Sequence, residues 1–124
     1  MNFNFDQSPP DPELFNRRAE DVANRLHQAK SPKMNKTTQI RRFYDELVGW
    51  QERIQNDDER FKQYEAYIRM LNAKVAYAKG RELVDEEFHQ WFSGCLKTTT
   101  SARALDHFRL HFEAVLGFLK PLRS

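Results

Sequence analysis

The chain has 124 residues, of which 40% are hydrophobic and 31% charged. This composition fits one folded domain and excludes an intrinsically disordered chain. The formal net charge is only +2, so the overall charge argues weakly for nucleic acid or another polyanion, and the local distribution of charge carries more information.

The number of cysteines and the hydropathy of the chain indicate the cellular environment in which the protein works. The single cysteine, Cys95, excludes an internal disulfide and is typical of a small buried residue in a reducing compartment. No apolar run approaches the ~20 residues that a membrane span needs, and the N-terminus lacks the basic and then apolar pattern of a signal peptide. We therefore expect a soluble, cytoplasmic protein that does not contact a membrane.

Helix breakers are concentrated at the N-terminus. The chain has four Gly and five Pro, and three of the prolines lie among the first twelve residues. Residues 1–10 are predicted to form a flexible tail, in which Phe3 and Phe5 could dock, and residues 11–124 a single domain. Few breakers and no strand-length alternation predict an all-α fold, a compact bundle of about five helices.

Capping residues and apolar spacing predict the first two helices. The first begins at Asp11, a capping carboxylate followed by Pro12, and ends at Ser31-Pro32. Thr37 or Thr38 caps the second. The positions expected to be buried are Phe15, Ala19, Val22, Leu26 and Ala29 in the first helix, and Ile40, Phe43, Leu47, Trp50 and Ile54 in the second.

The other three helices are predicted in the same way. A turn at 56–58 caps a third helix, which ends at Gly80 as a left-handed C-cap. Asp85 caps a short fourth helix, and residues 98–101 lead to a fifth helix that Pro121 stops. The positions expected to be buried are Phe61, Tyr64, Ile68, Leu71 and Val75, then Phe88, Trp91, Phe92 and Cys95, and finally Leu105, Phe108, Phe112, Val115, Leu116 and Leu119.

Two segments carry cations without neighbouring acids. Residues 30–44 hold five Lys or Arg, residues 66–81 hold four, and neither segment contains Asp or Glu. Antiparallel packing of the second and third helices would bring both sets of cations to one end, beside the free N–H groups that begin the second helix. This pattern favours a polyanionic partner, most simply nucleic acid. The cations concerned are Lys36, Arg41, Arg42, Lys74, Lys79 and Arg81.

Alternatives stay open within these segments. All six cations could form an ordinary solvated face, with Lys79 and Arg81 complementing a helix C-terminus. Tyr77 could stack on a base or simply pack at the end of its helix. Arg81 could instead anchor the chain after Gly80.

Signals for catalysis are weaker. His107 and His111 have the i,i+4 spacing of two metal ligands, but no third ligand lies nearby, and both are expected to be solvated on the polar side of their helix. Carboxylates at 57–59 and 85–87 fit helix starts. The sequence has no phosphate loop, nucleophile elbow or cysteine pair. None of these features requires an enzyme, a metal or a cofactor; a metal hydrolase using the two histidines stays open as the alternative.

The two cationic segments resemble the small subunit of the type III-A CRISPR effector, the Csm complex. The family pattern Thr-Thr/Ser-Gln-Ile/Leu-Arg-Lys/Arg-Phe-Tyr corresponds to residues 37–44, and Leu-x-x-Lys-x-Ala-Tyr-Ala-x-Gly-Arg to residues 71–81. With a looser match in the C-terminal aromatic helix, the resemblance covers residues 33–120. Ala73 stands where family members often have proline, so a local kink of the family is expected to be absent here.

The resemblance implies a non-catalytic, all-α subunit. Two or more copies would stack along the guide RNA–target RNA duplex beside other Csm subunits, with phosphate contacts that do not read sequence. Gln39 would be a further polar contact or a capping residue. The alternative function is a helical adaptor that binds only protein through the C-terminal helix, where Leu110 and Phe118 widen the apolar surface. The RNA-binding residues implied are Lys36, Gln39, Arg41, Arg42, Lys74, Lys79 and Arg81.

Overall fold

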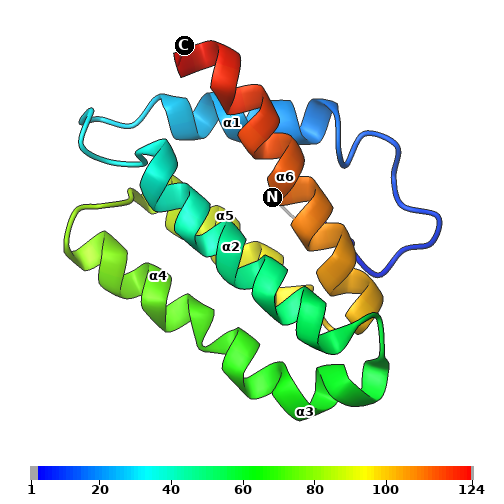
Figure 1. Ribbon diagram of the computed structural model, residues 1–124. Coiled ribbons are helices and arrows are strands. Elements are labelled where there is room, and N and C mark those ends of the chain that lie inside the picture. Colours follow the sequence, from blue (N-terminus) through cyan, green and yellow to red (C-terminus); the bar gives the residue numbers. More distant parts are fainter. Residues whose placement is uncertain (1–2, 124) are drawn as a thin grey trace.

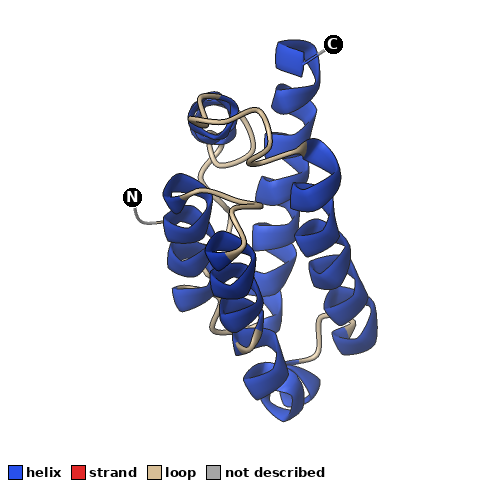
Figure 2. Ribbon diagram, turned by 90° about the vertical axis from the view of Figure 1, so that its left-hand side faces the viewer, coloured by secondary structure: helices blue, strands red, loops and turns tan. Residues whose placement is uncertain are grey.

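The computed structural model describes residues 3–123, and every regular element among them is an α-helix (Figures 1 and 2). The predicted all-α fold is confirmed. Met1, Asn2 and Ser124, which belong to the predicted tail and domain ends, lie outside the described residues. The helices are α1 (Arg17–His27), α2 (Thr37–Ile54), α3 (Asp58–Arg69), α4 (Leu71–Gly80), α5 (Glu86–Lys97) and α6 (Ala102–Arg123).

The core is built around α6, which packs against α1 and α2, while α5 packs against α1 and α4. Figure 1 shows α6 crossing α1, with α5 behind α2. The core contains many aromatic rings: Phe112 alone lies with its ring centroid 4.9 Å from that of Trp91 and 6.2 Å from that of Phe92. Edge-on and tilted ring pairs of this kind add to the free energy gained by burying their area.

The apolar stripes lie where the sequence predicts them, with a few members nearer the surface. Ile40, Phe43, Leu47 and Ile54 of α2 are buried, as are Phe108 and Phe112 of α6. The predicted core residues that are only half-buried are Phe15, Ala29, Trp50, Tyr64 and Leu116. Two predicted caps are confirmed, since Asp57 accepts hydrogen bonds from the N–H groups of Glu59 and Arg60, and Asp85 from that of Phe88.

The predicted first helix begins later than Asp11. Residues 11–16 form turns, in which the Asp11 carboxylate accepts the N–H of Glu13 at 3.0 Å, and the regular helix starts at Arg17. The turns bend the chain so that Leu14 enters the core with 1% of its surface exposed.

The predicted third helix is divided into α3 and α4 by Met70, three residues before Ala73. Its end also differs from the prediction: Gly80 is the last helical residue without a positive φ, and Glu82 takes the left-handed conformation at φ 61°. The N–H groups of Glu82 and Leu83 close this turn on the carbonyls of Lys79 and Ala78.

Two caps of the long helices also differ from prediction. Neither Thr37 nor Thr38 is the N-cap of α2; Lys36 takes that place and its side chain makes no capping hydrogen bond. Pro121 does not stop α6, which continues to Arg123. A proline so close to the end removes only one intrahelical hydrogen bond, so the last turn tolerates it.

The segment predicted as a tail packs against the bundle. Phe3 and Phe5 are 2% and 0% exposed. The Phe5 ring stacks on Phe108 with 5.4 Å between centroids, and the Phe5 carbonyl lies 2.6 Å from Nδ1 of His107. Residues 3–5 therefore form part of the same core as the helices.

His111 is buried, so the predicted solvated histidine pair is wrong. Its Nδ1–H donates to the Leu14 carbonyl at 2.7 Å, and its Nε2 accepts the indole N–H of Trp91 at 3.1 Å. Burial lowers the pKa of His111 from 6.5 to about 4, so the ring stays neutral. Because both ring nitrogens have partners inside the protein, this side chain connects α6 to α5 and to the turn before α1.

Candidate nucleic-acid interface

The start of α2 and the end of α4 lie side by side, as the antiparallel packing of the two segments predicts (Figure 1). Asn35 joins them: its backbone N–H donates to the Leu83 carbonyl at 2.9 Å, and its side-chain oxygen accepts the Asp85 N–H at 3.0 Å. Its side-chain NH₂ donates to the Leu26 carbonyl at 3.1 Å. Asn35 is fully buried with φ 56°, a conformation that asparagine adopts more readily than most residues.

This junction places cations from both sequence segments around one hollow of about 400 Å³. Lys33 and Lys36 come from the connection before α2, and Arg81 from the turn after α4. One carboxylate, that of Glu82, shares the lining. We call this hollow, with its three cations, the basic hollow. Lys36 and Arg81 are exposed and form no ion pair with a carboxylate among residues 3–123.

The N-terminus of α2 adds to the positive character of this end. Its first turn contains no acidic residue and its N-cap gives no side-chain acceptor, so the first N–H groups and the helix dipole are available to an anion. The guanidinium of Arg123, from the end of α6, donates to the Asn35 carbonyl at 2.6 Å and to Oγ1 of Thr37 at 3.0 Å. Partial burial lowers the pKa of Arg123.

Two of the predicted cations are paired with carboxylates. Nζ of Lys74 lies 2.9 Å from Oε1 of Glu46 on α2, and both side chains are largely accessible. Lys79 donates to the carboxylate of Glu86 at the start of α5, and this hydrogen bond lowers the pKa of Glu86. Sequence separations of 28 and 7 residues explain why acid-free segments still contain ion pairs: the acids come from other helices.

The other predicted positions lie on α2. Arg41 and Arg42 are exposed, as the helical wheel predicts, and Gln39 is half-buried. The Arg41 guanidinium carbon lies 6.0 Å from the ring centroid of Tyr44, whose hydroxyl bonds Glu113 of α6. Arg41 therefore points toward the α6 side of α2, away from the side on which Lys74 meets Glu46, so the six cations do not form one cluster.

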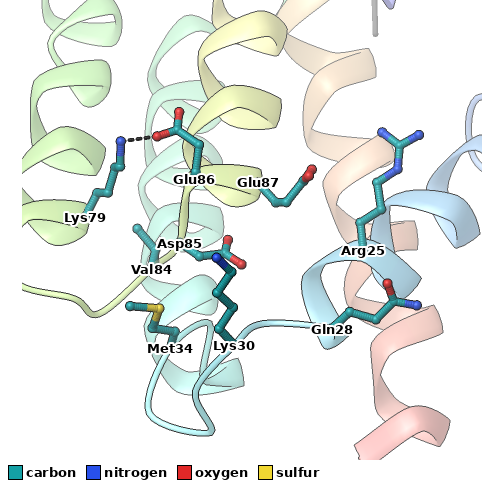
Figure 3. Close-up of a pocket in the computed structure, with 9 residues that line it drawn as sticks. All are labelled: Arg25, Gln28, Lys30, Met34, Lys79, Val84, Asp85, Glu86 and Glu87. Carbon is teal, nitrogen blue, oxygen red and sulfur yellow. Dashed lines mark hydrogen bonds and ion pairs between the residues drawn. The ribbon is translucent and has the colours of Figure 1, made fainter.

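A second hollow, of about 520 Å³, lies on the α1–α5 side of the junction (Figure 3). Met34 and Val84 contribute apolar surface, and charges of both signs surround them, including Lys30, Glu86 and Glu87. The Lys79–Glu86 pair is on its rim (Figure 3). The mixture of signs makes this hollow less suited to a polyanion than the basic hollow.

The residues that sequence reasoning missed are Lys33, Asn35 and Arg123. Lys33 belongs to the acid-free segment, so its charge was a usable signal. Asn35 lies in the connection before α2 and is a residue type that tolerates the left-handed conformation in turns, but nothing local shows that it joins two connections. Arg123 reaches the site from a helix that is 86 residues away in sequence from Thr37, which no local pattern reveals.

Other candidate chemistry finds little support in residues 3–123. No group of three or more His, Cys, Asp or Glu among them could hold a metal ion. Cys95 is buried, and the loss of hydration raises the pKa of its thiol well above 9.0, which disfavours the reactive thiolate.

Leu110 and Phe118, the basis of the adaptor alternative, are half-buried, and Phe118 packs against the core. No described helix has the length and hydropathy of a membrane span.

The fold and this junction define a small all-helical protein with a cation-lined end. The sequence model of the family described as Csm2 Type III-A matches residues 9–123. The chain therefore belongs to this family, the small subunit of the type III-A CRISPR effector, and the resemblance of the two motifs is confirmed. Membership implies assembly with other subunits of the Csm complex. No curated protein and no solved structure gives a significant match.

Proposed function

We propose that this protein is a non-catalytic RNA-binding small subunit, which acts in the cytoplasm and stacks in two or more copies along the guide RNA–target RNA duplex. Its cations contact phosphate oxygens and leave the reading of sequence to base pairing. The partners are then the two RNA strands, neighbouring Csm subunits and further copies of the same chain. No residue is assigned a catalytic role, and no metal or cofactor is needed.

The observation that carries this proposal is the basic hollow. Lys33, Lys36 and Arg81 converge there from two parts of the sequence, with only Glu82 opposing them. A phosphate at this place would also meet the uncapped first turn of α2. Each copy contributes few contacts, so we expect weak binding by one copy and much stronger binding when several copies share one RNA.

The ion pairs of Lys74 and Lys79 are compatible with RNA contacts. Both pairs are accessible to solvent, and exposed pairs contribute only about 0–1 kcal/mol. A phosphate can therefore replace the carboxylate at low cost in free energy. Arg41 and Arg42 remain part of the proposed RNA surface as exposed cations on α2, with Gln39 as a polar contact between them and Lys36.

The test compares two double variants with the same change in net charge. Lys36→Glu with Arg81→Glu reverses two cations of the basic hollow; Lys62→Glu with Lys97→Glu reverses exposed cations on α3 and α5. We expect the first variant to weaken binding to an RNA duplex at least about tenfold and to reduce the salt dependence of log K by about 2, since each phosphate contact contributes roughly 0.9.

The second variant should bind nearly as the unmodified protein does. Circular dichroism serves as the control for folding of both variants. Equal RNA affinity of the two double variants would place the interface elsewhere, and no RNA binding by the unmodified protein at low salt, even at high concentration, would argue for an adaptor that contacts only protein.

A further inference from the structure

The outer face of α3 and α4 carries large apolar side chains that the bundle leaves uncovered. Tyr67, Met70 and Tyr77 are 59%, 59% and 68% exposed, which makes them the three most exposed large hydrophobic residues among those described. A cluster of large apolar side chains that stays exposed on a soluble protein often marks an interaction site. We call these three residues the aromatic stripe.

The members of the stripe lie on one face. Met70 separates α3 from α4 but keeps helical backbone angles (φ −62°, ψ −19°). Tyr67 of α3 stacks on Trp50, and Lys74 of α4 pairs with Glu46, one turn earlier in α2, so both helices direct these side chains to the side that faces α2. Lys74 and Arg81 therefore alternate with the rings, and the Arg81 guanidinium carbon lies 5.9 Å from the ring centroid of Tyr77.

The ring of Tyr67 is held in place from behind. It stacks on Trp50 of α2 with 6.1 Å between centroids and 11° between planes. Trp50 also contacts Tyr64 at 5.5 Å, and the guanidinium of Arg53 covers Trp50 at 4.9 Å. One face of Tyr67 is thus backed by a fixed aromatic support, while the side chain stays largely open to solvent. A partner that stacks on it meets a preorganised surface.

The interleaved cations decide which partner fits. Tyr, Met and Arg are common at the centres of protein–protein interfaces, but lysine is depleted there, so Lys74 favours the other class of partner: single-stranded nucleic acid is bound by rings that stack on bases and by cations that follow the phosphates. An RNA duplex keeps its bases stacked inside, so it offers no base faces to tyrosine. The carboxylate of Glu46 on α2 already bonds Lys74, and Glu82 lies beside Arg81 in the basic hollow.

We propose that the aromatic stripe binds unpaired RNA, with separate bases stacking on Tyr67 and Tyr77, phosphates between these bases near Lys74, and a phosphate beyond Tyr77 near Arg81. The two tyrosines are ten residues apart, about 15 Å along the helices, so one strand can place a different base on each. Because Arg81 also lines the basic hollow, a strand can pass from the hollow onto the stripe. This inference rests on the proposed function only in taking RNA as the partner.

The experiment uses the full chain and three probes of equal length: an unstructured RNA strand, the same strand without bases, and an RNA duplex. We expect the unmodified protein to bind the normal strand better than the abasic strand. Tyr67→Ala and Tyr77→Ala should each weaken binding of the normal strand about tenfold, with no change for the duplex or for the abasic strand. Phe at either position should restore binding, because it keeps the ring.

Two controls make the result specific. Leu122→Ala removes the other exposed large hydrophobic residue, 39% exposed on α6, and should leave all three affinities unchanged. Stacking on Tyr67 should also quench the fluorescence of Trp50 behind it, whereas Trp91 is 8% exposed and out of reach of the probe.

The outcomes separate this inference from the proposed function. In one outcome, duplex binding depends on Lys36 and Arg81, but single-strand binding does not change when either tyrosine is replaced or when the bases are removed. This outcome overturns the inference about the stripe and leaves the proposed function standing. Tyrosine variants that bind RNA normally but no longer assemble with other Csm subunits would identify the stripe as a protein interface and also overturn it. Loss of duplex binding on reversal of Lys36 and Arg81, with loss of single-strand binding in the tyrosine variants, supports both.

Discussion

Similar residue types serve opposite purposes in two regions of this protein. In the first region, residues 3–16 with α1, α5 and α6, most aromatic rings face inward, and the buried His111 has a partner for each ring nitrogen. In the second, α2 to α4 with the connections at their ends, cations and tyrosines face solvent. The first region therefore stabilises the fold, and the second leaves side chains free for a partner.

The largest effect should follow from removing a ring of the first region. Phe112→Ala removes a fully buried ring that contacts Trp91, Phe92 and Phe108. We expect a loss of about 3–5 kcal/mol in the free energy of unfolding, measured by urea denaturation. Tyr77→Ala, on the outer face of α4, should change it by less than ~0.5 kcal/mol. Similar losses in both variants would remove the distinction between the two regions.

Acid should weaken the first region through His111. Its pKa is about 4 in the folded protein against 6.5 when exposed, so between these values the unfolded chain binds the proton more readily. The free energy of unfolding therefore has its full value above about pH 6.5. It falls by about 3 kcal/mol in total as the pH drops toward 4. His111→Gln should show a smaller loss over this window; an identical pH dependence of both proteins would contradict the assignment.

Asn35 connects the two regions, and its replacement should have an intermediate effect. Asn35→Ala leaves the Asp85 N–H without its acceptor and places alanine at φ 56°. We expect a loss of about 2 kcal/mol in stability and weaker RNA binding, since Lys36 and Arg81 would no longer be held together. Asn35→Gly relieves the backbone cost and should lose about 1 kcal/mol less. Equal stability of all three proteins would show that the hydrogen bonds of Asn35 do not stabilise the junction.

The smallest effect is expected for the ion pairs of the second region. Lys74→Ala and Lys79→Ala should each lower the free energy of unfolding by less than ~1 kcal/mol, because both pairs are accessible to solvent. Denaturation at two salt concentrations measures this. A larger loss would mean that these lysines are needed for folding, and would argue against their release to bind phosphate.

Much of the fold could be predicted from the sequence because its signals are local. Asp57 and Asp85 cap their helices as the three-residue patterns around them indicate. The family was evident for the same reason, since residues 37–44 and 71–81 carry two short motifs. The buried stripe of α2 follows from spacing alone, apart from Trp50, which stays half-buried because its neighbours Tyr64 and Tyr67 are themselves near the surface.

What could not be predicted depends on partners distant in the chain. His111 looked polar on a helical wheel, but Trp91 supplies a hydrogen-bond donor and the Leu14 carbonyl an acceptor, and these partners allow its burial. Lys79 looked free because its segment lacks acids, yet Glu86 lies across the following turn. At the candidate site, the convergence of Lys36 with Arg81 was predictable from antiparallel packing, whereas the roles of Asn35 and Arg123 required knowledge of the tertiary structure.

Phe3 and Phe5 have a practical consequence for anyone who shortens this protein. The family match begins at residue 9, so a boundary chosen from that match would discard both side chains, although each is almost completely shielded from water. The shortened chain would expose Phe108 and the imidazole of His111, which these rings now cover. If such a fragment aggregates on purification, the cause would be the loss of these two core side chains and not a low stability of proteins in this family.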